Sequence, residues 1–431
     1  MKPLPKVLFL NHSVRDGGPG KSLFYLLKYL DRERINPYVL VPKDDVFSER
    51  LKTEGLYENV IIDKRFPENL KRPRIFNDAD GRGKNDGGRG ERSTAMPGRI
   101  RLSVQGITAL LMKFISILLN LLDLSSLVVT SPHIIKKNGI DLIYCNGTQA
   151  KIAGALMGLV SGRPVIWHVR NIQQTKVLGS IIYSLARLPQ VKRIICVSGP
   201  TAEQFPAAKE KLVVIHNAID EEEYDPSATI GDLRSEYGIP ASTTVIGSTG
   251  RIVPRKGYPL FVEAARLYLE KAPVKNKNVK FVIVGDTPYF FQDNHLTYIK
   301  ELVNKYELQD YFIFTGYRPD VKTSLKDFDI FVIPSNYPDP FPRSVIEAMS
   351  FALPVIGFKA GGIVESVEDG VTGILNEPGD TEGMGEAILK LSRDKKLLRK
   401  MGKAGRDRVK AKFAAEHIAH EIQDKILEVL G

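Results

Sequence analysis

Two cations stand five residues apart just after a predicted strand in the second half of the chain. Arg251 and Lys256 flank a short loop that follows the strand predicted over Thr244–Thr249 and leads into a helix. A guanidinium holds an oxyanion through two parallel hydrogen bonds, and an ammonium acts as a compact point charge. The pair is suited to clamping a diphosphate, although a basic loop of this kind is also typical of a solvated surface.

Two carboxylates lie around the start of a later predicted helix. Asp339 lies in a proline-rich loop after the strand predicted over Asp329–Ile333, and Glu347 lies about one turn inside a helix that begins near Arg343. Carboxylates at this end of a helix can accept hydrogen bonds from sugar hydroxyls, while free amides of the first turn receive an anion. Capping and solvation are the alternative for the pair taken alone.

The first strand-to-helix turn contains Gly17-Gly18, which lets a backbone approach a ligand in front of a helix N-terminus. Neither common phosphate-binding loop is present. A Walker A loop needs glycine where this chain has Arg15, and the Gly-x-Gly-x-x-Gly spacing is missing. A plain tight turn therefore remains an alternative to a ligand site.

Short apolar strands alternate with helical stretches throughout the chain, and they must position these residues. Their Val- and Ile-rich runs without polar alternation are typical of buried parallel strands, so the fold class is α/β with two Rossmann-like domains. We expect domains at 1–220 and 221–412, with the boundary in the Pro- and Gly-containing stretch 220–242. The predicted strands are Val7–Asn11, Tyr38–Val41, Val60–Ile62, Asp141–Cys145, Pro164–Val169, Arg193–Val197, Leu212–Ile215, Thr244–Thr249, Val279–Val284, Phe312–Thr315, Asp329–Ile333, Pro354–Phe358 and Gly373–Leu375.

The ordered combination of these segments resembles the retaining GT-B glycosyltransferases of glycosyltransferase family 4. Gly250-Arg251 and Lys256-Gly257 are followed about 90 residues later by Asp339-Pro-Phe, Glu347-Ala-Met and Pro354-Val. The similarity spans nearly the whole chain and implies two domains facing across a cleft. It also implies that a C-terminal helix, 413–431, crosses back to the first domain. Supporting matches are His216-Asn217-Ala-Ile-Asp220, Val284-Gly-Asp286, Phe314-Thr-Gly316 and Gly361-Gly362-Ile-Val-Glu365.

The resemblance also implies the roles of the site residues. Arg251 and Lys256 would hold the donor diphosphate, Glu347 would bind the nucleotide ribose, and Asp339 with the backbone after Phe341 would hold hydroxyls of the transferred sugar. His168, at the end of a strand of the first domain, matches the family's histidine near the sugar. The other donor-binding residues implied are Gly17, Gly18, Gly316, Tyr317, Arg318, Pro342, Arg343 and Ser344.

The implied reaction is metal-independent transfer with retention of configuration from a nucleotide-diphosphate sugar, most simply a UDP- or GDP-sugar. Two cations and a helix N-terminus can offset the charge of the departing diphosphate. No cofactor is expected. No metal is expected either, because the Asp-x-Asp motif that could bind one, Asp78-Ala-Asp80, lies in a polar stretch far from these motifs. Two departures from the family, Asp339 for Glu and Pro342 for Gly, bear on the choice of donor sugar.

The segment 64–101 has eleven Lys or Arg residues against five Asp or Glu, a local net charge of +6, and is expected to be a mobile basic insertion. A predicted amphipathic helix, 107–122, follows it. One interpretation is a surface loop and a helix whose apolar face packs on the sheet. The other is a basic loop and helix that dock on an anionic membrane.

Composition narrows the class of protein further. The 431 residues are 43% hydrophobic and 26% charged, which excludes a mostly disordered chain, and two cysteines exclude a disulfide framework. No signal peptide is expected, so the chain is placed in the cytoplasm or peripherally at the inner membrane face. The net charge of +11 favours anionic partners, here the donor and a glycan or lipid-linked acceptor. No recognisable nucleic-acid-binding module is present.

A nucleotide-sugar epimerase or a non-catalytic relative is the alternative to a glycosyltransferase within the same fold.

Overall fold

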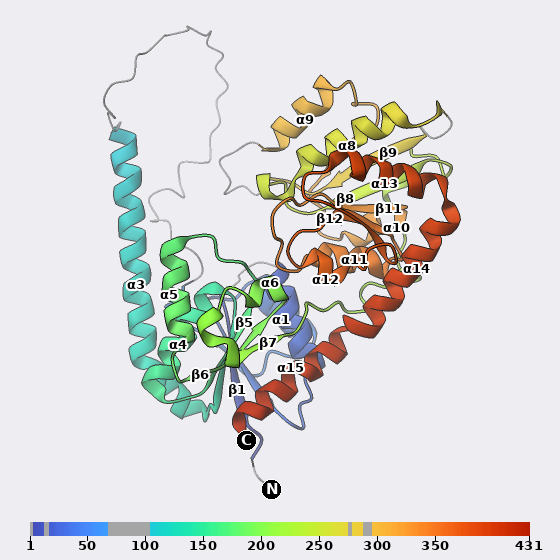
Figure 1. Cartoon of the computed structure of the whole chain (residues 1–431). Coiled ribbons are helices and arrows are strands. Elements are labelled where there is room, and N and C mark those ends of the chain that lie inside the picture. The colour runs from blue at the N-terminus through green and yellow to red at the C-terminus, as the bar shows by residue number, and fades with distance from the viewer. Residues whose placement is uncertain (1–2, 13–16, 68–103, 275–277, 288–294) are drawn as a thin grey trace.

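The computed structural model describes residues 3–12, 17–67, 104–274, 278–287 and 295–431, and the side chains of 104–114 are excepted. Two parallel sheets, each covered by helices, form two domains joined near residue 220 (Figure 1). All thirteen predicted strands are present, three of them with the predicted bounds. The prediction of an α/β fold with two Rossmann-like domains is therefore confirmed.

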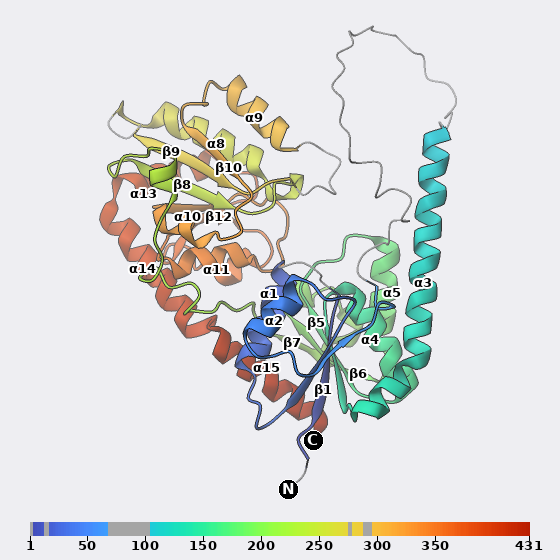
Figure 2. The same cartoon turned by 180° about the vertical axis from the view of Figure 1, so that it is seen from behind.

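The first domain has a seven-stranded sheet of order β3-β2-β1-β4-β5-β6-β7. Helices α1, α2 and α15 cover one face and α3, α4 and α5 the other, each with its own apolar core (Figure 2). The strands are β1 (Lys6–Asn11), β2 (Asn36–Val41), β3 (Val60–Ile62), β4 (Leu142–Asn146), β5 (Val165–Val169), β6 (Val191–Cys196) and β7 (Leu212–Val214). The helices are α1 (Gly18–Tyr29), α2 (Val46–Thr53), α3 (Val104–Asn138), α4 (Thr148–Ser161), α5 (Lys176–Ala186) and α6 (Gly199–Ala202).

The second domain has a six-stranded parallel sheet of order β10-β9-β8-β11-β12-β13 around one continuous apolar core. Its strands are β8 (Thr244–Thr249), β9 (Val279–Val284), β10 (Phe312–Gly316), β11 (Ile330–Ile333), β12 (Val355–Phe358) and β13 (Gly373–Asn376). Its helices are α7 (Leu233–Glu236), α8 (Tyr258–Lys271), α9 (His295–Lys305), α10 (Lys322–Asp327), α11 (Arg343–Ser350), α12 (Ile363–Ser366), α13 (Thr381–Arg393) and α14 (Lys395–Lys412).

The chain crosses between the domains twice, and the two crossings lie side by side. After α14, helix α15 (Ala415–Leu430) returns to the first domain, as predicted, and packs against α1 (Figure 1). The Ile219 amide donates to the Phe413 carbonyl over 2.8 Å, and the Ala415 amide donates to the Ile219 carbonyl over the same distance. These backbone bonds tie both crossings into one joint.

Helix α3 differs from the prediction. It is much longer than the expected 107–122, and its described N-terminal half stands out from the domain (Figure 1). Leu118, Leu121 and Leu122, expected to pack on the sheet, are 47%, 54% and 59% exposed. Apolar spacing identifies a helix face but not what covers it, so that interpretation is wrong for these residues. The predicted mobile insertion, 64–101, lies mostly outside the described residues, as does Asp78-Ala-Asp80.

Candidate functional site

The candidate site lies where the strand order of the second sheet reverses, between β8 and β11. In open parallel sheets, loops at the carboxyl ends of the strands leave a crevice at this point, which is where ligands bind. The loop after β8 carries Arg251 and a 3-10 turn that ends at Lys256. The loop after β11 carries Asp339. The sequence-predicted cations and the first carboxylate thus come from the two neighbouring strands at the switch point.

Lys256 and Asp339 form an ion pair, with 2.6 Å between Nζ and Oδ2 and side chains only 18% and 15% exposed. The turn that positions Lys256 needs a glycine directly after it. Gly257 has φ +69°, and a Cβ there would lie 1.9 Å from the Pro334 carbonyl oxygen. Arg251 is exposed in the same loop as Lys256. Desolvation and the charge of Arg255 lower the pKa of Arg251, while the charge of Asp339 acts in the opposite direction.

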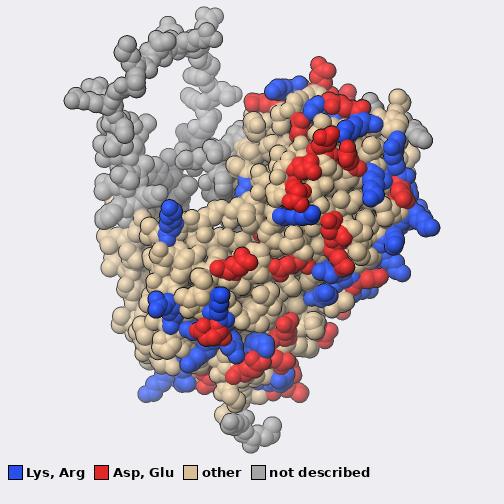
Figure 3. All heavy atoms as spheres, viewed as in Figure 1, with Lys and Arg blue, Asp and Glu red and all other residues tan. Residues whose placement is uncertain are grey.

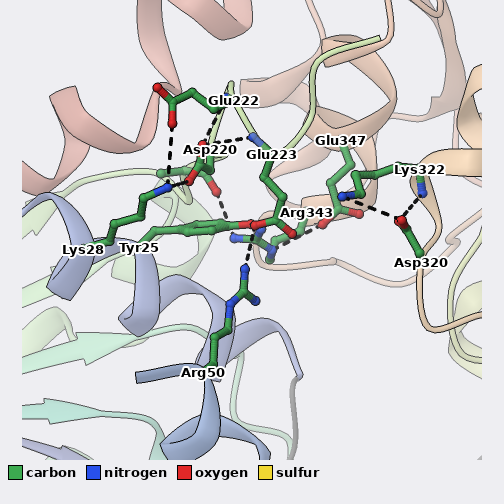
Figure 4. A network of polar contacts seen from close by, with 11 residues as sticks. Tyr25, Lys28, Arg50, Asp220, Glu222, Glu223, Asp320, Lys322, Arg343 and Glu347 are labelled. Carbon is green, nitrogen blue, oxygen red and sulfur yellow. Dashed lines mark hydrogen bonds and ion pairs between the residues drawn. The ribbon is translucent and has the colours of Figure 1, made fainter. Parts of the chain in front are cut away.

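Arg343 and Glu347 form a second ion pair, one turn apart on α11. The distance from Nε to Oε1 is 3.4 Å, and the side chains are 10% and 11% exposed (Figure 4). Arg343 also reaches into the first domain, where Nη1 donates to the Ala218 carbonyl over 2.8 Å and to Ser22 Oγ over 3.2 Å. Its guanidinium lies 5.1 Å from the centre of the Tyr25 ring.

The first domain approaches Arg343 through its glycine turn. Gly17 is the N-cap of α1 and Gly18 its first residue, and a Cβ on Gly18 would lie 3.6 Å from Arg343 Cδ. The predicted glycine pair is thus brought beside the start of α11.

Glu223, on the linker, accepts hydrogen bonds from Tyr25 Oη over 2.8 Å and from Arg50 over 2.6 Å (Figure 4).

His168 is the last residue but one of β5 and is 1% exposed. Burial, together with the positive charges of Arg170 and Lys151, lowers its pKa well below the usual value, so the imidazole is neutral. Its Nδ1 lies 2.5 Å from Tyr144 Oη and 3.1 Å from Arg170 Nη2. Both neighbours can donate a proton, and the arginine can do nothing else. Nδ1 is therefore the acceptor, and Nε2 carries the proton.

Arg170 links this histidine to the donor loop of the other domain. Its guanidinium donates to Asn217 Oδ1 over 2.6 Å, and Asn217 Nδ2 donates to the Phe341 carbonyl over 2.9 Å. Burial lowers the pKa of Arg170 to about 10, which leaves it cationic at neutral pH. Sequence reasoning missed Arg170 and Tyr144. Arg170 could have been found as a candidate, because it lies two residues beyond His168, directly after the end of β5.

The remaining predicted residues lie at the edges of the site. Gly316 ends β10 with φ +72°, and Tyr317 is 74% exposed. Arg318 pairs with Asp232 over 2.8 Å and also with Glu236, so carboxylates of its own domain already hold this cation. Pro342 is buried as the N-cap of α11, and Ser344 is half-buried in the first turn.

A further contact between the domains involves His216 and Glu365. Glu365, on α12, lies 2.8 Å from His216 Nε2 and accepts a hydrogen bond of 2.8 Å from the Gly199 amide of the first domain. The His216 ring lies against Phe341, with ring centres 4.7 Å apart. Within the described ranges, no three His, Cys, Asp or Glu side chains form a group that could hold a metal ion.

Two family models match the chain, one to each domain. The model of the glycosyl transferases group 1 matches residues 230–408, which include β8, β11 and α11, and the model of glycosyltransferase family 4 matches residues 95–223. The chain belongs to the group 1 glycosyltransferases, with the GT-B fold. The predicted resemblance to this family and its fold is confirmed.

Similar proteins include other glycosyltransferases. The UDP-Gal:alpha-D-GlcNAc-diphosphoundecaprenol alpha-1,3-galactosyltransferase of Escherichia coli is 26% identical over 72% of this chain and 80% of its own length. The putative glycosyltransferase YtcC of Bacillus subtilis is 31% identical over 53% of this chain, but the match spans only 57% of that protein. The Anabaena protein HepE, solved with UDP and glucose, has a TM-score of 0.73 and 22% identity over 98% of this chain and 99% of its own.

Proposed function

We propose that this group 1 glycosyltransferase moves a sugar, with retention of configuration and without a metal ion, from a nucleotide-diphosphate sugar to a hydroxyl of a glycan or lipid-linked acceptor. The pairing of Lys256 with Asp339 at the switch point, with Arg251 beside them, carries the proposal. A cation that now neutralises a carboxylate of the site is placed to exchange that partner for a diphosphate. The carboxylate is then free to accept hydrogen bonds from sugar hydroxyls.

Each of the other site residues has a role in the proposed donor complex. Glu347 accepts hydrogen bonds from the ribose, and Phe341 to Ser344 surround the sugar and phosphates with backbone at the start of α11. Gly17 and Gly18 approach the donor from the first domain. Gly316, Tyr317 and Arg318 edge the base. His168 offers its Nε2 proton to a sugar oxygen.

The bond between the sugar C1 and the diphosphate oxygen breaks as the acceptor oxygen bonds to C1 on the same face. Negative charge gathers on the leaving diphosphate, where Arg251 and Lys256 stabilise it. The leaving phosphate oxygen takes the proton of the acceptor hydroxyl, so no enzyme nucleophile is needed. Preorganised cations in a partly desolvated site stabilise such charge more than they would in water.

The proteins compared above favour a UDP-sugar as donor. HepE was solved with UDP and with UDP-glucose, and the Escherichia coli relative is named for transfer from UDP-Gal to a diphosphoundecaprenol-linked sugar. A Staphylococcus aureus relative, 25% identical over 65% of this chain, is named for capsular polysaccharide biosynthesis. We infer from these names a role in cell-surface polysaccharide or glycolipid synthesis, at the cytoplasmic face of the membrane.

A donor screen tests the proposal. UDP-, GDP- and ADP-sugars are added singly to the protein, and thermal stabilisation and release of nucleoside diphosphate are measured with and without glycan and lipid-linked acceptors. We expect one nucleotide to raise the melting temperature, and its sugar to appear on an acceptor with the anomeric configuration of the donor. Conversion of the donor sugar to an epimer without acceptor, or stabilisation by none of the nucleotides, would overturn it.

A further inference from the structure

We propose that the exposed apolar surface of α3 and α5 is the part of the first domain that docks on a lipid bilayer containing anionic lipids. This apolar surface consists of Ile117, Leu118, Leu121, Leu122 and Val129 on α3 and of Val177 and Ile181 on α5. The proposal concerns where the protein binds, and it stands whether or not the proposed transfer reaction is correct.

The exposure of these side chains is unusual for a water-soluble surface. Val129 and Val177 are 76% and 73% exposed, and Ile181 is 46% exposed. Ile115–Asn138 is the one segment within the described residues that is long and apolar enough to cross a membrane, and only 17% of its most apolar window is buried. Large exposed apolar surface of this kind on a monomer marks an interaction site.

The same helix is anchored firmly at its other end. Leu127 and Ile135 of α3 are at most 3% exposed and belong to the apolar core beneath α4 and α5. The C-terminal half of α3 therefore stays with the domain. The N-terminal half of its described part projects beyond the helices that cover the sheet (Figure 1). This geometry suits a helix that lies in the membrane interface, because the anchored half prevents a full crossing.

The exposure pattern favours a bilayer over a protein partner. Leu119 follows Leu118 by one position, so it lies about 100° further around the helix and outside the main exposed face. Its side chain is nevertheless 44% exposed. The apolar arc is therefore wide, and a bilayer interface can cover the whole of it. A helix of this apolar character lies with its side chains in the boundary between headgroups and acyl chains.

The net positive charge of the helices around the apolar surface complements an anionic leaflet. From Ile115 onward, α3 together with α4 and α5 contains the basic residues Lys136, Lys137, Lys151 and Lys176 and one acidic residue, Asp123. Lys176 is exposed directly before Val177 of the apolar surface, and Lys136 and Lys137 are exposed at the anchored end of α3. In Figure 3 the visible described atoms on this flank of the first domain are mostly uncharged, while charged side chains gather over the second domain and the lower end of the first. Basic residues near such a surface are attracted to anionic lipid headgroups.

A site-specific fluorescent probe tests contact with lipid directly. The two native cysteines, Cys145 and Cys196, are buried, so Leu118→Cys can be labelled selectively with an environment-sensitive dye on the full chain. We expect a blue shift and increased emission on adding vesicles of phosphatidylcholine and phosphatidylglycerol. The control is Ile230→Cys, a position that is 85% exposed on the other side of the domain boundary. Its dye should not respond.

Vesicle flotation measures how much the apolar surface contributes to the binding of the protein to lipid vesicles. Leu118→Glu/Leu122→Glu should lower the vesicle-bound fraction about tenfold or more, since each carboxylate must be drawn toward the acyl region. Ile230→Glu, the matched control for an exposed apolar residue, should bind as the wild type does. Binding of the wild type should weaken at high salt without disappearing, because part of it comes from apolar burial.

Three results would overturn the proposal. One is a wild type that does not float with anionic vesicles, and another is a double variant that floats equally well. The third is a wild type that is a dimer in analytical ultracentrifugation and does not bind vesicles, together with a double variant that is a monomer. That result would assign the apolar surface to a second copy of the chain.

Discussion

The Asn217 side chain joins the two domains at Phe341, whose carbonyl accepts a hydrogen bond of 2.9 Å from Nδ2. On its other side, Asn217 Oδ1 accepts a hydrogen bond from the buried Arg170, which contacts His168. A continuous polar path thus runs from the histidine of the first domain to the loop that carries Asp339. A change at Asn217 is therefore expected to affect both the joint between the domains and the binding of a donor at that loop.

Replacing Asn217 with Leu should weaken both stability and donor binding. The substitution leaves the buried Arg170 with one acceptor fewer and the Phe341 carbonyl without its donor, at a cost of about 1–3 kcal/mol for each unsatisfied group. Urea unfolding measures the free energy of unfolding, and the KM for the donor is measured alongside. Asn59→Leu is the control, because the Asn59 side chain bonds to Asn36 and Pro37, both within the first domain. A donor KM that stays at the wild-type value in Asn217→Leu would contradict the coupling.

Removing either cation of the clamp should abolish most transfer activity. Lys256→Ala and Arg251→Ala each remove a charge-assisted contact that strengthens as the diphosphate leaves, and such a contact contributes about 10²–10³ in rate. Steady-state kinetics with the preferred donor measure the loss. Arg255→Ala is the matched control, since Arg255 is an exposed cation of the same turn. Near-normal turnover in both clamp variants would place the diphosphate elsewhere.

The strands could be predicted from sequence because buried parallel strands are continuous apolar runs between turn residues. Thr244–Thr249 and Val279–Val284 have the predicted bounds for this reason. The loop residues Arg251, Lys256 and Asp339 could also be placed from the sequence, since each lies in the loop that follows such a strand. Their meeting at one point depends on which strands are neighbours.

The contacts of His168 could not be predicted, because they depend on strand register. Tyr144 reaches the histidine because Asn146 pairs with His168, and Tyr144 lies two residues before Asn146 on the same face of the sheet. The pairing of Arg343 with groups of the first domain depends on how the domains meet, and no local pattern encodes that. The sequence left two interpretations of α3 open, because apolar spacing looks the same on a buried helix and on one that docks on a membrane.

Transfer activity should survive chelation of divalent ions. Arg251, Lys256 and the free amides at the start of α11 supply positive potential where the diphosphate leaves. Activity is measured after dialysis against EDTA and again after addition of Mg²⁺ or Mn²⁺. Complete loss in EDTA that either ion restores would contradict the proposed metal independence.

The stability of the protein should depend on His168 at acidic pH. Its pKa is lowered well below the usual value by burial, so below about pH 6.5 the unfolded chain binds a proton that the folded chain does not. Stability therefore falls as the pH decreases from about 6.5 toward the folded pKa. The slope contributed by one such group is at most about 1.4 kcal/mol per pH unit.

Urea unfolding of the wild type and of His168→Gln between pH 7.5 and 5 checks this dependence. The variant should lose less stability over that range, whatever its stability at pH 7.5. His133→Gln, at an exposed position on α3, should follow the wild type. Equal slopes for the wild type and His168→Gln would show that the histidine takes up its proton in the folded state.

A double-mutant cycle should show that Arg343 and Glu347 depend on each other. Both side chains are nearly buried, and removing one partner of a buried pair leaves a charge without compensation. Arg343→Leu should therefore destabilise the protein by about 3–5 kcal/mol. Part of that loss is the hydrogen bonds to Ser22 and Ala218, which no change at Glu347 can restore.

Adding Glu347→Gln to Arg343→Leu should recover some of the lost stability, because the uncompensated carboxylate is then gone. Glu347→Gln alone should raise the donor KM, as the amide is a poorer acceptor for ribose hydroxyls than the carboxylate. The free energies of unfolding of the wild type, the two single variants and the double variant give the coupling energy. Strictly additive losses would mean that the Arg343 guanidinium stabilises the joint between the domains without stabilising the Glu347 carboxylate.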